Sequence, residues 1–264
     1  MIVVVDGHAA HAATGGVAST GDGPAVVLIH GAGMDGTVWQ LQTRYLAHRG
    51  VRALAVDLPG HGRSEGETLA TIEDMADWVT RFMTAAGFTA AHVVGHSMGS
   101  FIALELASRP AAVAESITLC GTSTAMPVHP QLLADATDNL PAAAALMAAW
   151  GHAKLAHVGL NPTPGLWMLG GAQALVENSR PGVLASDFRA CMSYSNALIA
   201  ASHVSCPATV VIGLGDKMTP PKGGRALAAA LGSATVIELP DTGHSMMTES
   251  PRIIRTAILN SARA

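Results

Sequence analysis

Short apolar runs alternate with longer stretches of helical spacing along most of this chain. The apolar runs have the length of strands that are buried on both faces of a sheet. They fall at residues 25–29, 51–56, 91–94, 113–120, 208–212 and 234–239, and the helical stretches fall at 37–48, 71–86, 100–108, 221–231 and 251–263. This alternation predicts an α/β architecture, with a mostly parallel sheet flanked by helices.

The alternation has two exceptions, one near the N-terminus and one in the second half. Residues 2–5 and 8–13 flank an Asp6-Gly7 turn and predict a hairpin. From residue 124 to about 205 the pattern contains no strand, only Ala-rich and Met-rich helical segments broken by prolines such as Pro162 and Pro164. We interpret this segment as a helical cap inserted after the sixth strand. The expected domains are a core of residues 1–123 and 206–264 and a cap of residues 124–205.

Composition narrows the class of protein. Hydrophobic residues make up 49% of the 264 residues and charged residues 13%, which predicts a compact fold. The net charge of −4 and the 15 scattered Lys and Arg residues argue against a nucleic-acid or membrane-surface partner. The three cysteines share no metal-ligand spacing, and no signal peptide or spanning segment is visible. We expect a cytoplasmic monomer or homodimer without a metal or cofactor.

Gly95-His96-Ser97-Met98-Gly99 lies between a predicted buried strand and a predicted helix. A serine flanked in this way by glycines forms a nucleophile elbow, a tight turn that lifts the hydroxyl clear of the sheet. Bulkier residues at either glycine would clash. The pattern predicts Ser97 as a nucleophile, with the neighbouring His96 supporting the turn.

A serine hydroxyl needs a base within hydrogen-bonding reach, and the base needs an acid to orient it. Asp216 follows the strand at 208–212, where ligands of open α/β sheets bind. His244 follows the next strand, 28 residues later. We therefore predict Asp216 as the acid and His244 as the base. Asp241 is a rival acid, but it shares one short loop with His244, which makes a direct contact awkward.

An ester-cleaving serine also needs backbone donors for the oxyanion that forms on the substrate. One predicted donor is the N–H of Met98, at the start of the helix after the elbow. The other is the N–H of Ala32, because the small residues of His30-Gly31-Ala32-Gly33-Met34 let the main chain approach a substrate.

These motifs together resemble the α/β-hydrolase superfamily, in particular small bacterial carboxylesterases and lactonases with a helical cap. The resemblance covers nearly the whole chain and includes Asp57-Leu58-Pro59-Gly60-His61-Gly62-Arg63-Ser64. That stretch looks like a structural loop of the family, and we assign it no chemistry. A serine nucleophile argues against the dehalogenases and epoxide hydrolases of this fold. Ser245, where many carbon–carbon bond hydrolases carry an aromatic residue, disfavours that activity.

The expected function is hydrolysis of small to medium, mainly apolar carboxylic esters through an acyl-enzyme. Alternatives are a lactonase or carbon–carbon bond hydrolase, an acyltransferase or perhydrolase, and a ligand-sensing receptor with vestigial hydrolysis. Large apolar side chains of the cap are candidates for the substrate pocket, although each of them taken singly is better explained by packing of the cap helices. They are Met126, Met147, Trp150, Trp167, Met168 and Met192.

Overall fold

The computed structural model describes residues 1–109, 113–160, 162–163 and 165–263. Pro164, one of the prolines expected to interrupt the cap, lies outside the described residues. The strands form one eight-stranded sheet in the order β1-β2-β4-β3-β5-β6-β7-β8. They are β1 (Ile2–Val5), β2 (His8–Ala13), β3 (Ala25–Ile29), β4 (Arg52–Val56), β5 (Ala91–His96), β6 (Ala114–Cys120), β7 (Ala208–Gly213) and β8 (Thr235–Leu239).

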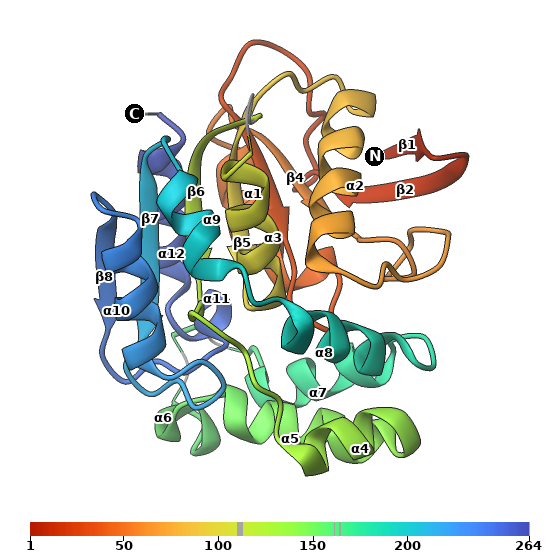
Figure 1. The fold of residues 1–264 in the computed structure, drawn as a ribbon, viewed down its shortest axis with the longest axis vertical. Helices are drawn as coiled ribbons and strands as arrows, with labels where there is room; N and C mark the ends of the chain where they lie inside the picture. The colour runs from red at the N-terminus through yellow and green to blue at the C-terminus, as the bar shows by residue number, and fades with distance from the viewer. Residues whose placement is uncertain (110–112, 161, 164, 264) are drawn as a thin grey trace.

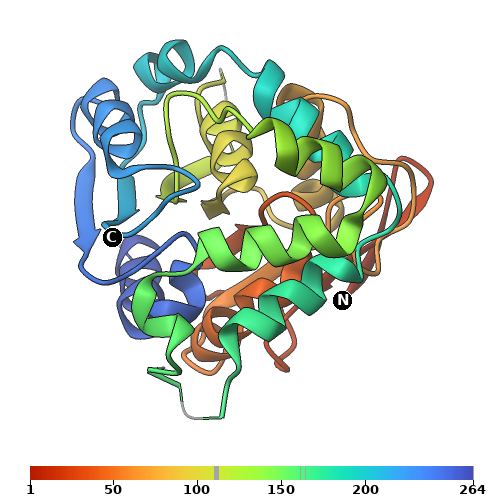
Figure 2. The same ribbon diagram turned by 90° about the horizontal axis from the view of Figure 1, so that it is seen from below.

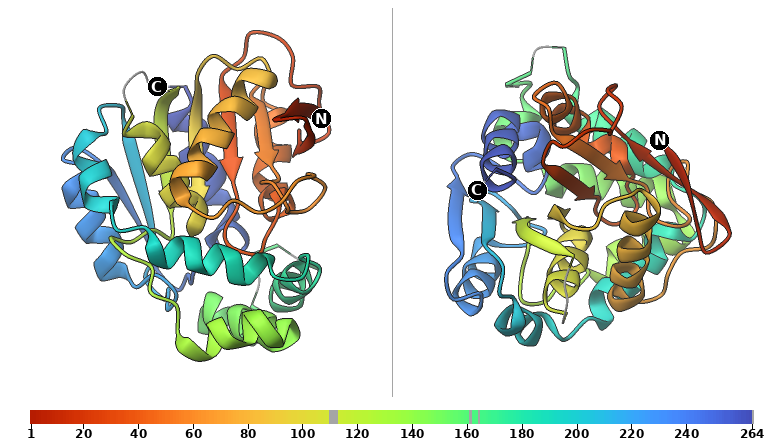
Figure 3. Two further views of the ribbon diagram at one scale, coloured as in Figure 1. Left: turned by 45° about the vertical axis from the view of Figure 1, so that its right-hand side comes forward. Right: turned by 90° about the horizontal axis from the view of Figure 1, so that it is seen from above.

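The sheet is parallel from β4 to β8 and antiparallel only where β2 pairs with β1 and with β4. The predicted N-terminal hairpin is therefore confirmed, and Figure 3 shows it at the edge of the sheet. The prediction of a mostly parallel sheet is confirmed as well.

Helices cover both faces of the sheet, as predicted. On one face α2 packs against α3, α3 against α9, and α9 against α10. On the other face α1 packs against α11 and α12. These helices are α1 (Gln40–Ala47), α2 (Ile72–Ala85), α3 (Met98–Ala107), α9 (Ala197–His203), α10 (Pro221–Ala230), α11 (Met246–Glu249) and α12 (Pro251–Ser261).

The continuous apolar runs are explained by this two-sided covering. All five residues of β3 are buried. Val27 and Ile29 pack into the apolar cluster under α2 and α3, whereas Val26 and Leu28 pack into the cluster under α1 and α12. Successive side chains of a strand point to opposite faces, so a strand with helices on both sides needs apolar residues at every position.

Five further helices, α4 to α8, lie together at one end of the molecule (Figure 1). Within this group α4 packs against α5 and α8, and α5 packs against α7 (Figure 2). The helix α9 follows them in the chain but joins the layer beside the sheet, through α3 and α10. The five helices are α4 (Pro130–Asp138), α5 (Leu140–Gly151), α6 (Lys154–His157), α7 (Met168–Glu177) and α8 (Val183–Ser193).

Within the described part of the chain, no helix combines the length and the apolar character that crossing a bilayer requires.

Candidate active site

Ser97 occupies a strained turn between β5 and α3. Its backbone has φ 54° and ψ −119°, outside the regions that residues with a side chain ordinarily adopt. The turn is held because the N–H of Ser97 donates to the carbonyl of Cys120, at 2.9 Å, and the N–H of Ser100 donates to the carbonyl of Ser97, at 2.8 Å. The neighbouring β6 therefore fixes the serine at the end of β5.

The two glycines of the elbow are required by space. A Cβ atom on Gly95 would overlap the carbonyl oxygen of Gly99, and a Cβ atom on Gly99 would overlap the carbonyl oxygens of Ile29 and His30. The helix α3 thus starts in direct contact with the end of β3. No other residue type fits at either position without moving the backbone.

Asp216 and His244 meet beside the elbow. The Nδ1–H of His244 donates to Oδ2 of Asp216 at 2.8 Å, and both side chains are buried. The other carboxylate oxygen accepts the N–H groups of Met218 and Thr219, each at 2.8 Å. The hydroxyl of Thr219 donates to Oδ2 at 2.7 Å. Asp216, rather than Asp241, is therefore the carboxylate bonded to His244.

The charge state of Asp216 follows from these contacts. Burial alone would raise the pKa of its carboxyl group. The charge of His244 and the hydrogen bonds from His244 and Thr219 outweigh burial, and they hold the pKa below its ordinary value. Asp216 is consequently ionised at neutral pH and accepts the Nδ1–H of His244, which leaves Nε2 of His244 as the basic nitrogen.

His96 lies behind this pair and does not replace it. Its Nε2–H donates to the backbone carbonyl of His244 at 2.9 Å, and the two rings lie 4.6 Å apart. Complete burial, reinforced by the neighbouring His244, lowers the pKa of His96 to about 3. His96 is therefore a neutral donor. Its hydrogen bond holds the loop of His244 against the end of β5, next to Ser97.

The two predicted oxyanion donors lie close to Ser97 in the chain or in space. Met98 follows Ser97 and begins α3, and Ala32 lines the same pocket as Ser97. Within the described residues, neither backbone N–H donates a hydrogen bond. Buried N–H groups are rarely left without an acceptor. Both amides are available to an oxygen atom bound beside Ser97.

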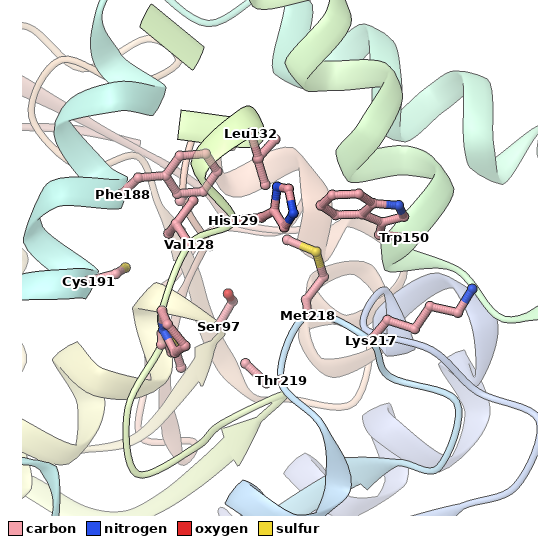
Figure 4. A pocket seen from close by; sticks show the side chains of 13 residues that line it. Ser97, Val128, His129, Leu132, Trp150, Phe188, Cys191, Lys217, Met218 and Thr219 are labelled. Atoms are coloured by element: carbon pink, nitrogen blue, oxygen red, sulfur yellow. The ribbon is translucent and has the colours of Figure 1, made fainter. Parts of the chain in front are cut away.

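The hydroxyl of Ser97 points into a pocket of about 120 Å³ (Figure 4). Its walls are mainly apolar and come from the loop after β3, the segment after β6, the helices α4, α5 and α8, and the loop after β7. The lining residues are Ala32, Ser97, Met126, Pro127, Val128, His129, Leu132, Trp150, Phe188, Cys191, Lys217, Met218 and Thr219.

Only part of the predicted pocket set meets at Ser97. Met126 and Trp150 line this pocket. Trp167 and Met168 line a separate hollow between α7 and the start of α11. Of the other two predicted residues, Met147 packs against the larger apolar cluster and Met192 is 45% exposed.

The sequence reasoning missed several pocket residues, among them Phe188, Cys191 and Met218. Met218 follows Asp216 by two positions, so its proximity could have been inferred from the predicted acid. Phe188 and Cys191 lie on α8, and the sequence carries no sign of which face of that helix would meet the core.

Within the described ranges, no three His, Cys, Asp or Glu side chains gather in an arrangement that could hold a metal ion.

Comparison with known proteins places the chain among related enzymes. Residues 26–257 match the model of the alpha/beta hydrolase family. The chain is 31% identical to a pimeloyl-(acyl-carrier protein) methyl ester esterase of Chromobacterium violaceum over 249 residues, which cover 87% of this chain and 90% of that protein.

Two further similarities carry less weight, the first because the matched segment is short and the second because its sequence identity is low. An esterase of the same description from Methylococcus capsulatus is 41% identical over 111 residues, but the match spans only 40% of its length. The crystal structure of the enol-lactonase from Burkholderia xenovorans LB400 superposes over the full length of both chains with a TM-score of 0.88 and 24% identity. This last similarity concerns the fold alone. The family match over most of the sequence shows that the chain belongs to the α/β hydrolase family.

Proposed function

We propose that this protein is a serine esterase in which Ser97 is the nucleophile, His244 the general base and Asp216 the acid that orients it. The observation that carries the proposal is the buried 2.8 Å bond between Asp216 and His244, joined through His96 to a strained serine elbow that opens into an apolar pocket. A structural serine has no need of a positive φ, and strain of this kind is concentrated at functional sites.

The proposed reaction begins when Oγ of Ser97 attacks the ester carbonyl and its proton passes to Nε2 of His244. The carbonyl oxygen becomes an oxyanion and accepts hydrogen bonds from the N–H groups of Ala32 and Met98. The tetrahedral intermediate collapses, the alcohol leaves with the proton from His244, and an acyl group stays on Ser97. A water molecule that gives its proton to His244 then releases the acid.

Asp216 contributes charge and orientation throughout this cycle. Its ionised carboxylate stabilises the imidazolium that forms on His244 and keeps the hydrogen on Nδ1. The hydrogen bonds from Met218 and Thr219 fix the carboxylate in turn. The proposed chemistry uses side chains and backbone amides of this chain and requires no metal or organic cofactor.

The pocket supports small to medium, mainly apolar acyl groups as substrates. Met126, Trp150 and Phe188 are among its apolar lining residues, and its volume of about 120 Å³ suits a short acyl chain. The esterase of Chromobacterium violaceum, 31% identical to this chain, acts on a methyl ester by its description, which supports an ester with a small alcohol. We further propose that residues 124–205, apart from α9, act as the cap over a core of residues 1–123 and 206–264, since α9 packs against α3 and α10 beside the sheet.

The proposal is tested with a panel of p-nitrophenyl esters of increasing acyl length and a matching set of lactones. Multiple turnover of the short esters is expected, with loss of turnover in Ser97→Ala. Ser108→Ala is the matched control, because this serine ends the same helix and, among the described residues, its hydroxyl donates only to the carbonyl of Glu105. Turnover by Ser97→Ala at the wild-type rate would contradict the proposal, and preference for lactones over every ester would redirect it to lactonase activity.

A further inference from the structure

Asp187 is a carboxylate of the cap helix α8 that lies completely buried against the core. Its Oδ2 accepts two hydrogen bonds from residues that are distant in the sequence. One comes from the backbone N–H of Gly33, at 2.8 Å, and the other from Nε2 of His61, at 2.9 Å. Gly33 follows Ala32, one of the two proposed oxyanion donors, so this cap residue is bonded directly to the loop that carries that donor.

The partner of Asp187 is the buried ring of His61. Nδ1 of His61 lies 2.9 Å from the carbonyl of Pro59, and a carbonyl only accepts, so this nitrogen carries a hydrogen. Nε2 faces Oδ2 of Asp187, so both ring nitrogens have an acceptor that favours the protonated form. Burial alone would lower the pKa of His61, but the charge of Asp187 and the bonds to Asp187 and Pro59 outweigh burial and raise it. The two side chains form an ion pair that is 1% and 0% exposed.

The helix α8 also packs against the loop of residues 30–34, which carries Ala32. Gly33 has φ 66°, a conformation that glycine adopts freely, and a Cβ atom there would lie 2.7 Å from Leu184 of α8. Leu184 and Asp187 are three residues apart and share one face of the helix. At the other end of the loop, the ring of His30 lies 4.8 Å from the ring of His61. Nε2 of His30 accepts the N–H of Leu58.

The arrangement is costly to the fold. Within the described part of the chain, Oδ1 of Asp187 has no hydrogen-bond partner. A buried ion pair contributes little net stability, and apolar side chains of similar volume often replace such pairs without loss. A buried charge with an unsatisfied oxygen is therefore better explained by what it positions than by the stability that it adds.

We propose that Asp187 is a positioning residue for the oxyanion hole. It fixes the amide of Gly33 and thereby aims the N–H of Ala32 at the oxygen that becomes charged beside Ser97. Docking of α8 onto the core and completion of the oxyanion hole are consequently one event. This inference rests on the proposed function, since it assigns a role within that site.

The test compares Asp187→Ala, which removes the oxygen that bonds to Gly33 and His61, with Asp187→Asn, which keeps one oxygen for Gly33. Asp138→Asn, at the exposed end of the cap helix α4, is the matched control. Rates for p-nitrophenyl acetate are expressed per active site, counted with a phosphonate that labels Ser97. We expect kcat to fall about 10²-fold in Asp187→Ala, as for a reacting group displaced by about 1 Å, with KM within about twofold. Asp187→Asn should recover part of this loss.

A second readout separates positioning from general destabilisation. A trifluoromethyl ketone forms a charged tetrahedral adduct with the serine, so its affinity should fall in parallel with kcat, whereas the affinity for the product acid should not change. If the buried imidazolium prevents Asp187→Ala from folding, the double variants with His61→Asn allow the same comparison. Variants with wild-type kcat per active site, or with equal losses of affinity for ketone and acid, would overturn the inference. Full activity of Ser97→Ala in the same series would instead overturn the proposed function.

Discussion

The floor and the roof of the Ser97 pocket are built on different principles. The floor here means Ala32, Ser97 and Met98 together with Asp216 and His244 behind them. These residues follow the carboxyl ends of β3, β5, β7 and β8, where backbone hydrogen bonds and tightly packed glycines hold the chain. The roof consists of side chains such as Met126, Trp150 and Phe188, which come from the segment after β6 and from α5 and α8. Its shape depends on how those helices dock.

This difference separates two kinds of effect. Changes in the floor should reduce the rate for every substrate, because they alter the groups proposed to act on the ester bond itself. Changes in the roof should alter which acyl group is accepted while the chemistry persists. A roof substitution that abolished all turnover, or a floor substitution that affected only one substrate, would show that the division is wrong.

The largest effect is expected from Ser97→Ala. Without the nucleophile no acyl-enzyme forms, and kcat should fall by about 10⁶-fold, the scale seen when a catalytic serine is removed. Steady-state turnover of p-nitrophenyl acetate measures this loss, with Ser108→Ala as the control. A loss below about tenfold would show that Ser97 is not the nucleophile.

Asp216→Asn should have the next largest effect. The amide is isosteric but uncharged, so it no longer stabilises the imidazolium and can hold His244 in the wrong tautomer, and kcat should fall by about 10⁴-fold. Asp241→Asn is the matched control, since this residue is close to His244 in the sequence. The loss should be the same for acetate and hexanoate esters, and a loss confined to one of them would contradict a role in the floor.

The roof is tested with two tryptophans that the sequence places in the same cap. Trp150→Ala enlarges the Ser97 pocket and should shift the ratio of kcat/KM for hexanoate over acetate esters about tenfold toward hexanoate. Trp167→Ala alters only the separate hollow and should leave this ratio within about twofold. Equal shifts in the two variants would show that the hollows act as one substrate site.

The smallest effect concerns stability rather than rate. Burial lowers the pKa of His30 and His92 to about 4 and that of His96 to about 3. Between pH 6.5 and 4 the unfolded chain therefore binds protons that the folded chain does not, and the free energy of unfolding should fall as pH falls. His61, whose pKa is raised, acts in the opposite direction, and its contribution to stability is lost as pH rises above 6.5.

Urea unfolding at several pH values measures this dependence. His92→Gln is the most informative variant, because within the described part of the chain the ring of His92 bonds only to Ser116 and Thr118 of β6. The pH slope in this variant should decrease by about one proton, while turnover at pH 7.5 stays unchanged. An unaltered slope would show that His92 is not neutral in the fold.

The floor could be predicted from the sequence because short-range rules govern it. An apolar run marks each buried strand, and glycines mark the places where the chain must turn tightly. Ser97, Asp216 and His244 each directly follow such a mark, so their approximate meeting point followed from the order of the strands. The helix α11 was missed because its four residues are too few to show a helical period.

The roof could not be predicted in the same way. The helix α5 is apolar on nearly every side, so its sequence does not say which face meets the pocket. Met147 and Trp150 of this helix both pack against the apolar cluster, but of the two it is Trp150 that also lines the pocket. Which side chains line the pocket depends on contacts among helices that no local pattern encodes.

The contact between His61 and Asp187 was even harder to predict from the sequence. The two residues are 126 positions apart, and His61 belongs to a loop that we expected to be purely structural. Neither residue has a neighbour of catalytic type that would have drawn attention to it. Only the docking of α8 onto the core brings them together.

The most direct measurement for the central claim is the mass of the enzyme during turnover. The wild-type protein, mixed with p-nitrophenyl acetate and quenched in acid within milliseconds, should carry one acetyl group, and fragmentation should locate it on Ser97. An initial burst of p-nitrophenol equal to the enzyme concentration should accompany it whenever deacylation is the slower step. An acetyl group found on another residue, or rapid turnover by Ser97→Ala, would contradict the account.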